Sequence, residues 1–168
     1  MQKIEVLFIC MGNICRSPTA QGVFRHLVVQ EGMSDVVVTD SAGTHAYHVG
    51  NPPDGQALAT AQQRGIDISD MRARRVGEED FERFHYVLAM DRDNYAILED
   101  MCPEQHRHKL RFFMEFAPER RETEVPDPYY GGRLGFEKVF DLVEEASRGL
   151  LEDIRTQFLP GGGEMRSA

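Results

Sequence analysis

The chain has 168 residues, 41% of them hydrophobic, which is the size and composition of one soluble domain. Asp and Glu (28) outnumber Lys and Arg (19), so the formal net charge is −9 and general nucleic-acid binding is not expected. No apolar run reaches the roughly 18 residues of a membrane span, and the N-terminus lacks a signal-peptide cleavage site, so we expect no membrane partner. Three cysteines make no disulfide framework, which favours a reducing compartment, the cytoplasm.

Hydrophobic periodicity predicts strands that alternate with helices. Residues 3–10 form a continuous apolar run of strand length. Residues 17–31 follow with helical spacing, and their Ser-Pro start predicts an N-cap at Ser17. The β-branched segment 36–40 predicts a second strand. The further elements expected are helices at 56–64, 78–83, 91–101 and 136–158, and strands at 85–90 and 109–113.

This alternation predicts a single-domain, three-layer α/β sandwich. A four-stranded parallel sheet would be flanked by helices on both faces, doubly wound in the flavodoxin-like manner. We expect residues 1–159 to form the domain and the Gly-rich residues 160–168 to be a flexible tail. Ligands of such sheets bind at the carboxyl ends of the strands. Cys10 ends the first predicted strand, so the loop that follows it is the candidate site.

That loop has the sequence CMGNICRS and joins a buried strand to a helix, as a phosphate-binding loop does. Gly12 has no Cβ to crowd a tight curl, and Asn13 is a residue type that accepts a left-handed backbone. The planar guanidinium of Arg16 can clamp two oxygens of a tetrahedral oxyanion. Amide dipoles and Arg16 would favour the thiolate of Cys10, to which the Ser17 hydroxyl can donate a hydrogen bond.

The run CMGNICRSP resembles the signature of the low-molecular-weight protein tyrosine phosphatases, and other segments resemble that family in the same order. These segments are DSAGT at 40–44, GNPP at 50–53, AMD at 89–91 and DPYY at 127–130. The resemblance implies hydrolysis of phosphotyrosine in proteins, and of aryl phosphates, through a phosphocysteine intermediate. It implies no cofactor and no metal, because the loop amides and an arginine supply the positive charge.

The resemblance also implies a role for individual residues. Cys10 would attack phosphorus, Arg16 would hold the equatorial oxygens, and Asp127 would protonate the leaving phenolate and then activate water. Ser41 would support the loop by a hydrogen bond to Asn13. The residues implied in substrate binding line the loop or an aromatic slot: Met11, Gly12, Asn13, Ile14, Cys15, Ser17, Tyr47 and Tyr129. Peroxide would form a disulfide between Cys15 and Cys10 that shields Cys10 from irreversible oxidation.

Some positions depart from the family pattern. Many members have a histidine near residues 69–74 that supports the loop asparagine, and Met71 stands closest to that position here. The basic run Arg72, Arg74 and Arg75 is expected to be a solvated face. The histidines and cysteines do not form a metal-ligand set at recognised spacing, so we expect no metal site.

Three alternatives stay open: a phosphatase of the same fold acting on another phosphoresidue such as phosphoarginine, an arsenate reductase, and a catalytically silent phosphopeptide-binding module. An arginine phosphatase would be expected to have Thr in place of Ile14. An arsenate reductase needs relay cysteines, and Cys102 stands alone. A silent module does not need a nucleophile, an arginine and an acid together. The expected partners are tyrosine-phosphorylated proteins, a tyrosine kinase among the candidates, with inorganic phosphate as product.

Overall fold

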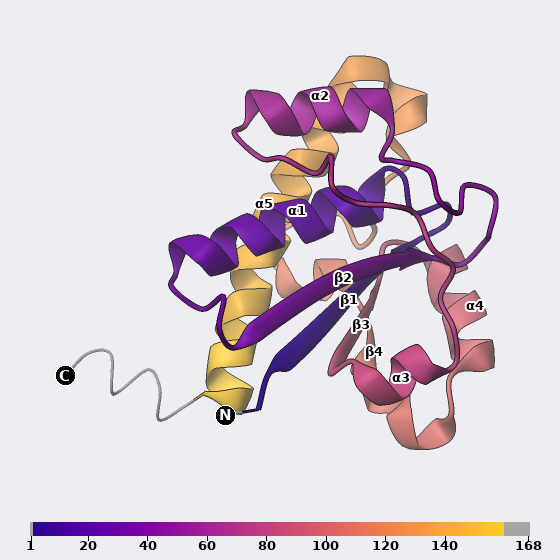
Figure 1. Cartoon of the computed structure of the whole chain (residues 1–168), viewed down its shortest axis with the longest axis vertical. Coiled ribbons are helices and arrows are strands. Elements are labelled where there is room, and N and C mark those ends of the chain that lie inside the picture. The colour runs from indigo at the N-terminus through magenta and orange to yellow at the C-terminus, as the bar shows by residue number, and fades with distance from the viewer. Residues whose placement is uncertain (1, 160–168) are drawn as a thin grey trace.

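The structure is a computed structural model that describes residues 2–159, without the side chains of residues 130, 132 and 133. The predicted tail at 160–168 lies outside the described residues. A parallel sheet with strand order β2-β1-β3-β4 forms the centre (Figure 1). Its strands are β1 (Ile4–Cys10), β2 (Val37–Gly43), β3 (Tyr86–Ala89) and β4 (Leu110–Phe112). The helices are α1 (Arg16–Gln30), α2 (Gly55–Gln63), α3 (Glu79–Arg83), α4 (Arg92–Met101) and α5 (Gly132–Phe158), with short 3₁₀ helices η1 (Glu104–Lys109), η2 (Phe113–Phe116) and η3 (Pro128–Gly131).

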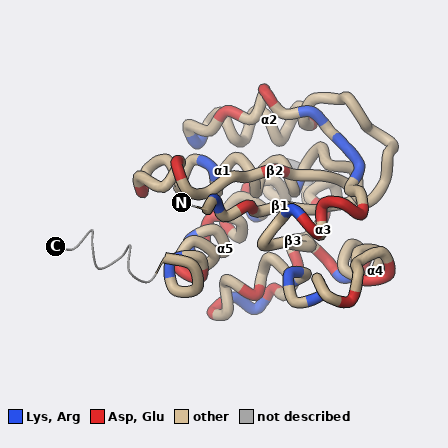
Figure 2. Tube along the Cα trace, turned by 60° about the horizontal axis from the view of Figure 1, so that its bottom comes forward, with Lys and Arg blue, Asp and Glu red and all other residues tan. Residues whose placement is uncertain are grey.

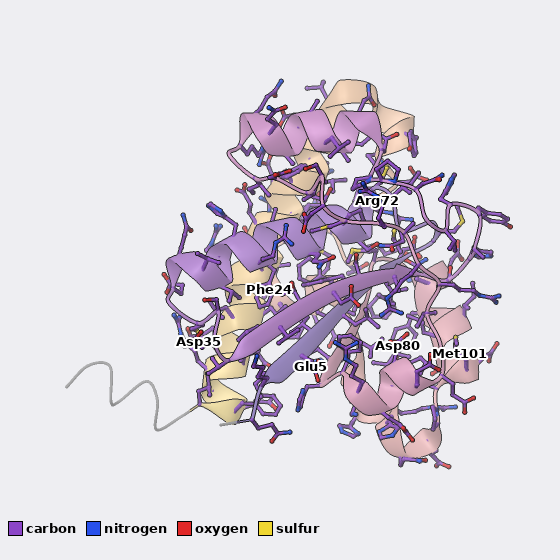
Figure 3. All side chains as sticks on the ribbon, viewed as in Figure 1. Glu5, Phe24, Asp35, Arg72, Asp80 and Met101 are labelled. Carbon is purple, nitrogen blue, oxygen red and sulfur yellow. The ribbon has the colours of Figure 1, made fainter. Side chains whose placement is uncertain are left out.

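The central strand β1 is buried on both faces, which explains its continuous apolar sequence. Val6 and Phe8 pack into a hydrophobic cluster with α1, α2 and α5, whereas Leu7 and Ile9 pack into a second cluster with α3 and α4. Figure 1 shows these two sets of helices on opposite faces of the sheet. Phe24 points from α1 toward the sheet (Figure 3), and its ring meets that of Phe8 edge-on with 5.8 Å between the centroids. The predicted α/β sandwich is therefore confirmed.

Most predicted boundaries lie within one residue of those in the structure, and three differences are instructive. The helix expected from Ser17 begins at Arg16, and no side chain caps it. The strand expected to end at residue 40 continues to Gly43, because Gly43 pairs with Cys10 at the end of β1. The long helix begins at Gly132 rather than at residue 136. The first two differences both lie next to the predicted loop, where contacts with Cys10 override local sequence preferences.

Charged residues lie mainly on helices and loops, with acidic and basic residues interspersed (Figure 2). Within the basic run, Arg72 and Arg75 are exposed as predicted. The solvated-face prediction is wrong for Arg74, which is half-buried and pairs with Asp40 and with Asp80, each at 3.0 Å. Asp80 belongs to α3, where Figure 3 labels it. Over residues 2–159, no helix is long and apolar enough to cross a membrane.

Candidate active site

Cys10 and Arg16 mark the two ends of a tight loop at the carboxyl end of the sheet. Both side chains are buried, although both are polar or ionisable. The Cys10 Sγ atom accepts a hydrogen bond from the backbone N–H of Asn13 at 3.3 Å. It also lies 3.0 Å from the Ser17 hydroxyl, whose oxygen accepts a hydrogen bond from Asn13 Nδ2 at 2.8 Å. With that oxygen serving as an acceptor, the Ser17 O–H is available to donate to the sulfur.

Asn13 holds the loop in its curled shape. Its φ is 58°, the left-handed conformation that the residue type predicts. Its buried amide also donates to Ser41 Oγ at 3.0 Å, which is the contact that the family resemblance implies. The amide oxygen accepts from the backbone N–H of Arg74 at 3.0 Å. This main-chain donor supports Asn13 without the family histidine, and a backbone N–H leaves no mark in the sequence by which it could be predicted.

Gln21 and Gly43 are site residues that the sequence analysis missed. Gln21, buried on α1, accepts a hydrogen bond from Ser41 Oγ at 2.7 Å and so orients the partner of Asn13. A Cβ on Gly43 would lie 2.7 Å from the carbonyl oxygen of Met11, so only glycine lets β2 run this close to the loop. Gln21 could have been suspected because it is a glutamine on the buried face of a helix. The role of Gly43 can be recognised only once the pairing of β2 with β1 is known.

Gly12 lies against the side chain of His48. A Cβ at this position would lie 2.9 Å from Cδ2 of His48, so a larger residue here would require the half-buried His48 ring to shift.

Arg16 is held in place by two partners. Its Nη1 donates to Asp91 Oδ2 at 2.6 Å and to the carbonyl of Val125 at 3.1 Å. The other carboxylate oxygen of Asp91 accepts from the Asn94 N–H at 2.8 Å and caps α4. Burial by itself would lower the pKa of Arg16, but the neighbouring Cys10 and Asp91 outweigh it and raise that pKa. The guanidinium is thus a fixed cation beside the sulfur.

Asp127 and Tyr129 lie in the segment that leads into α5, with Tyr129 in η3. The Asp127 carboxylate accepts a hydrogen bond from the Tyr129 N–H at 3.0 Å. The Tyr129 hydroxyl accepts from the Cys15 thiol at 3.3 Å and donates to Asp54 at 2.7 Å. Burial raises the pKa of Cys15 to about 12, partly offset by the hydrogen bond to Tyr129. Cys15 is therefore a neutral thiol. The structure brings the predicted acid to the rim of the loop that carries the predicted nucleophile.

The remaining residues of the sequence analysis differ in burial. Met11, Tyr47 and Tyr129, the residues implied for an aromatic slot, are 46%, 72% and 53% exposed. Tyr47 stacks on His45, with 5.1 Å between the ring centroids. Ile14 is half-buried against the core. Cys102 is at the opposite end of α4 from Asp91, where its thiol contacts the Pro103 carbonyl.

Comparison with known proteins identifies relatives of this chain along almost its whole length. Residues 5–159 match the family model described as low molecular weight phosphotyrosine protein phosphatase. The chain is 40% identical over 154 residues to the protein of that name from Schizosaccharomyces pombe, covering 91% of this chain and 98% of the relative.

Solved structures agree. A protein tyrosine phosphatase from Entamoeba histolytica superposes with a TM-score of 0.88 and 40% identity, covering 92% of this chain and 98% of that one. A Drosophila arginine phosphatase superposes with a TM-score of 0.82 and 28% identity, covering 92% and 99%. Because the matched residues 5–159 include the cysteine–arginine loop, the aspartate loop and all of the sheet but Ile4, the chain belongs to the low molecular weight phosphotyrosine protein phosphatase family.

Proposed function

We propose that this protein hydrolyses phosphotyrosine in proteins, and aryl phosphates, through a phosphocysteine intermediate. The observation that carries the proposal is the position of the Cys10 sulfur. It accepts from the Asn13 N–H at 3.3 Å, lies 3.0 Å from the Ser17 hydroxyl and has the cation of Arg16 beside it. Such surroundings favour a thiolate nucleophile and bind a phosphoryl group at the same place.

In the first step, the Cys10 thiolate attacks phosphorus and the bond to the phenolic oxygen breaks. The Nη1 atom of Arg16 faces Asp91 and Val125, so the opposite edge of the guanidinium is the one that can clamp two phosphoryl oxygens. The backbone amides of the loop stabilise the remaining charge. Asp127 gives its proton to the departing phenolate.

In the second step, water attacks the phosphocysteine. Asp127, now a carboxylate, takes a proton from that water, and inorganic phosphate leaves while the Cys10 thiolate is restored. The positive charge that both steps need comes from the loop amides and Arg16, so the mechanism calls for no cofactor. Met11, Tyr47 and Tyr129 would flank the flat ring of the substrate.

The proposal includes the substrates, the cellular compartment and the domain bounds of the enzyme. The substrates are tyrosine-phosphorylated proteins, a tyrosine kinase among the candidates. We place the protein in the cytoplasm, where a reducing environment keeps Cys10 and its buried neighbour Cys15 as the free thiols seen in the structure. Residues 1–159 form the catalytic domain.

The test is hydrolysis of para-nitrophenyl phosphate, a phosphotyrosine peptide and a phosphoarginine peptide, with a chelator present. We expect turnover of the first two and slow or no turnover of the third. Cys10→Ser removes the nucleophile and should lower turnover by well over tenfold, which corresponds to more than ~1.4 kcal/mol of barrier. It should still bind phosphate, because the loop amides and Arg16 remain. Preference for phosphoarginine, or a Cys10→Ser variant with more than about a tenth of wild-type rate, would contradict the proposal.

A further inference from the structure

A chain of hydrogen bonds connects the nucleophile's loop to the acid's loop. The Cys15 thiol donates to Tyr129 Oη at 3.3 Å, and the Tyr129 hydroxyl donates to Asp54 Oδ1 at 2.7 Å. We call these three residues the acid-loop anchor. Its members come from three separate segments: the phosphate-binding loop, the loop before α2 and the 3₁₀ helix η3 before α5.

The direction of the chain is fixed by the chemistry of its ends. Burial keeps Cys15 a neutral thiol, which can donate. A carboxylate has no proton to give, so Asp54 accepts from Tyr129. The hydroxyl of Tyr129 can satisfy both neighbours in only one orientation.

Asp54 is itself held firmly against the phosphate-binding loop. Its backbone N–H donates to the carbonyl of Ile14 at 2.8 Å. Its Oδ2 accepts from the N–H groups of Gln56 and Ala57, at 2.9 and 3.3 Å, and so caps α2. One carboxylate oxygen thus fixes the helix, and the other is free to fix Tyr129.

The backbone of Tyr129 passes this constraint to Asp127. Its N–H donates to Asp127 Oδ1 at 3.0 Å. The ring of Tyr129 also meets Phe136 edge-on, with 5.8 Å between the centroids, which restrains the ring from the α5 side. With Oδ1 engaged in this way, Oδ2 is the oxygen that would carry the proton toward the substrate.

We propose that Asp54 is a positioning residue for the reaction: it aligns the Asp127 carboxyl for proton transfer by holding the Tyr129 hydroxyl. This inference rests on the proposed function, in which Asp127 is the general acid. Asp54 itself transfers no proton. It sets the distance between the acid and the loop that holds the nucleophile.

The variant Asp54→Asn separates this role from helix capping. Asparagine is as good an N-cap as aspartate, and its amide oxygen can accept from Gln56 and Ala57. Its NH₂ group would then face Tyr129 and cannot accept the hydroxyl proton. The matched control is Asp67→Asn, because Asp67 also accepts a backbone N–H, that of Ser69 at 2.9 Å, in an exposed turn.

The measurement is kcat/KM for a series of aryl phosphates whose phenols differ in acidity, because kcat/KM includes the step in which the phenolate leaves. For phenyl phosphate, we expect Asp54→Asn to lower kcat/KM by roughly 2- to 12-fold, the net worth of one typical exposed hydrogen bond. The loss should shrink for nitrophenyl phosphates, whose leaving groups need less protonation. The Asp67→Asn control should match wild type across the series.

Combination with Asp127→Ala decides whether Asp54 acts through the acid. In that background, adding Asp54→Asn should change the leaving-group dependence little, because no carboxyl remains to be aligned. An undiminished further loss there, an equal loss for every leaving group, or no loss at all would overturn the inference. Failure of the wild-type enzyme to use its Cys10 thiol on any aryl phosphate would instead overturn the proposed function.

Discussion

Asn13 is the residue on which the shape of the phosphate-binding loop depends. Its side chain makes hydrogen bonds to Ser17, Ser41 and the Arg74 backbone while its own backbone is left-handed. Asn13→Ala removes these bonds, leaves buried partners unpaired and keeps the unfavourable φ, so we expect a loss of about 2–4 kcal/mol in unfolding free energy. Asn13→Gly loses the same bonds but accepts the φ, so it should be the less damaged of the two.

Urea unfolding and kcat/KM of both Asn13 variants provide the check. The expected order is wild type, then glycine, then alanine, for both stability and activity. An alanine variant that equals wild type in stability would show that the loop does not need this side chain.

Cys15 allows a prediction on oxidation. Peroxide oxidises the Cys10 thiolate to a sulfenic acid, and the Cys15 thiol can then attack that sulfur, releasing water and forming a disulfide. Wild-type enzyme treated with peroxide should therefore recover activity with a thiol reductant. Cys15→Ser should recover much less, because its sulfenic acid is open to further oxidation. Equal recovery of the two proteins would remove the protective role, and mass spectrometry of the Cys10 peptide identifies the product.

At the scale of elements, the contact between β2 and the phosphate-binding loop depends on Gly43. The Cβ of an alanine would lie 2.7 Å from a main-chain oxygen, which cannot move without shifting the loop. We expect Gly43→Ala to cost roughly 1–3 kcal/mol and to lower kcat/KM. Gly55→Ala is the matched control, since nothing lies within 4 Å of its added Cβ. It should be neutral or stabilising by about 0.4–1 kcal/mol.

Thermal unfolding and steady-state kinetics on both glycine variants test this contact. If Gly43→Ala proved as stable and as active as Gly55→Ala, the close approach of β2 would not constrain the loop.

Element types were predictable because their causes are local, whereas the site depends on contacts between distant residues. The continuous apolar run of β1 and the spacing of α5 follow from hydrophobic burial. Ser17 shows where this reasoning fails: Ser before Pro predicts a helix cap, but the hydroxyl turns to the Cys10 sulfur instead. The partnership of Asp54 with Tyr129 spans 75 positions in the chain. Only the folded sheet brings such residues together.

For the molecule as a whole, buried acidic groups predict a loss of stability at high pH. The pKa of Cys15 rises from 9.0 to about 12 on folding, and burial also raises the pKa of Tyr86. The unfolded chain therefore releases these protons at lower pH than the folded one. The contribution of Cys15 to the unfolding free energy is fully present below about pH 9 and is lost as the pH rises from there toward 12.

Urea unfolding at about pH 8 and about pH 10.5, with reductant present, measures this decline. Cys15→Ser carries no ionisable group at this site and should show a shallower decline than wild type. Parallel declines in the two proteins would show that Cys15 does not contribute.

The helix α1 has no side-chain cap at its start, although Ser17 and Pro18 stand there. A bound oxyanion would complete this helix as a capping side chain does in others. Binding and release of phosphate should therefore tighten and loosen the first turn of the helix that packs on the sheet. Because the chain has no tryptophan to report such a change, amide hydrogen exchange at Arg16, Ser17 and Thr19 is the natural readout of an occupied site.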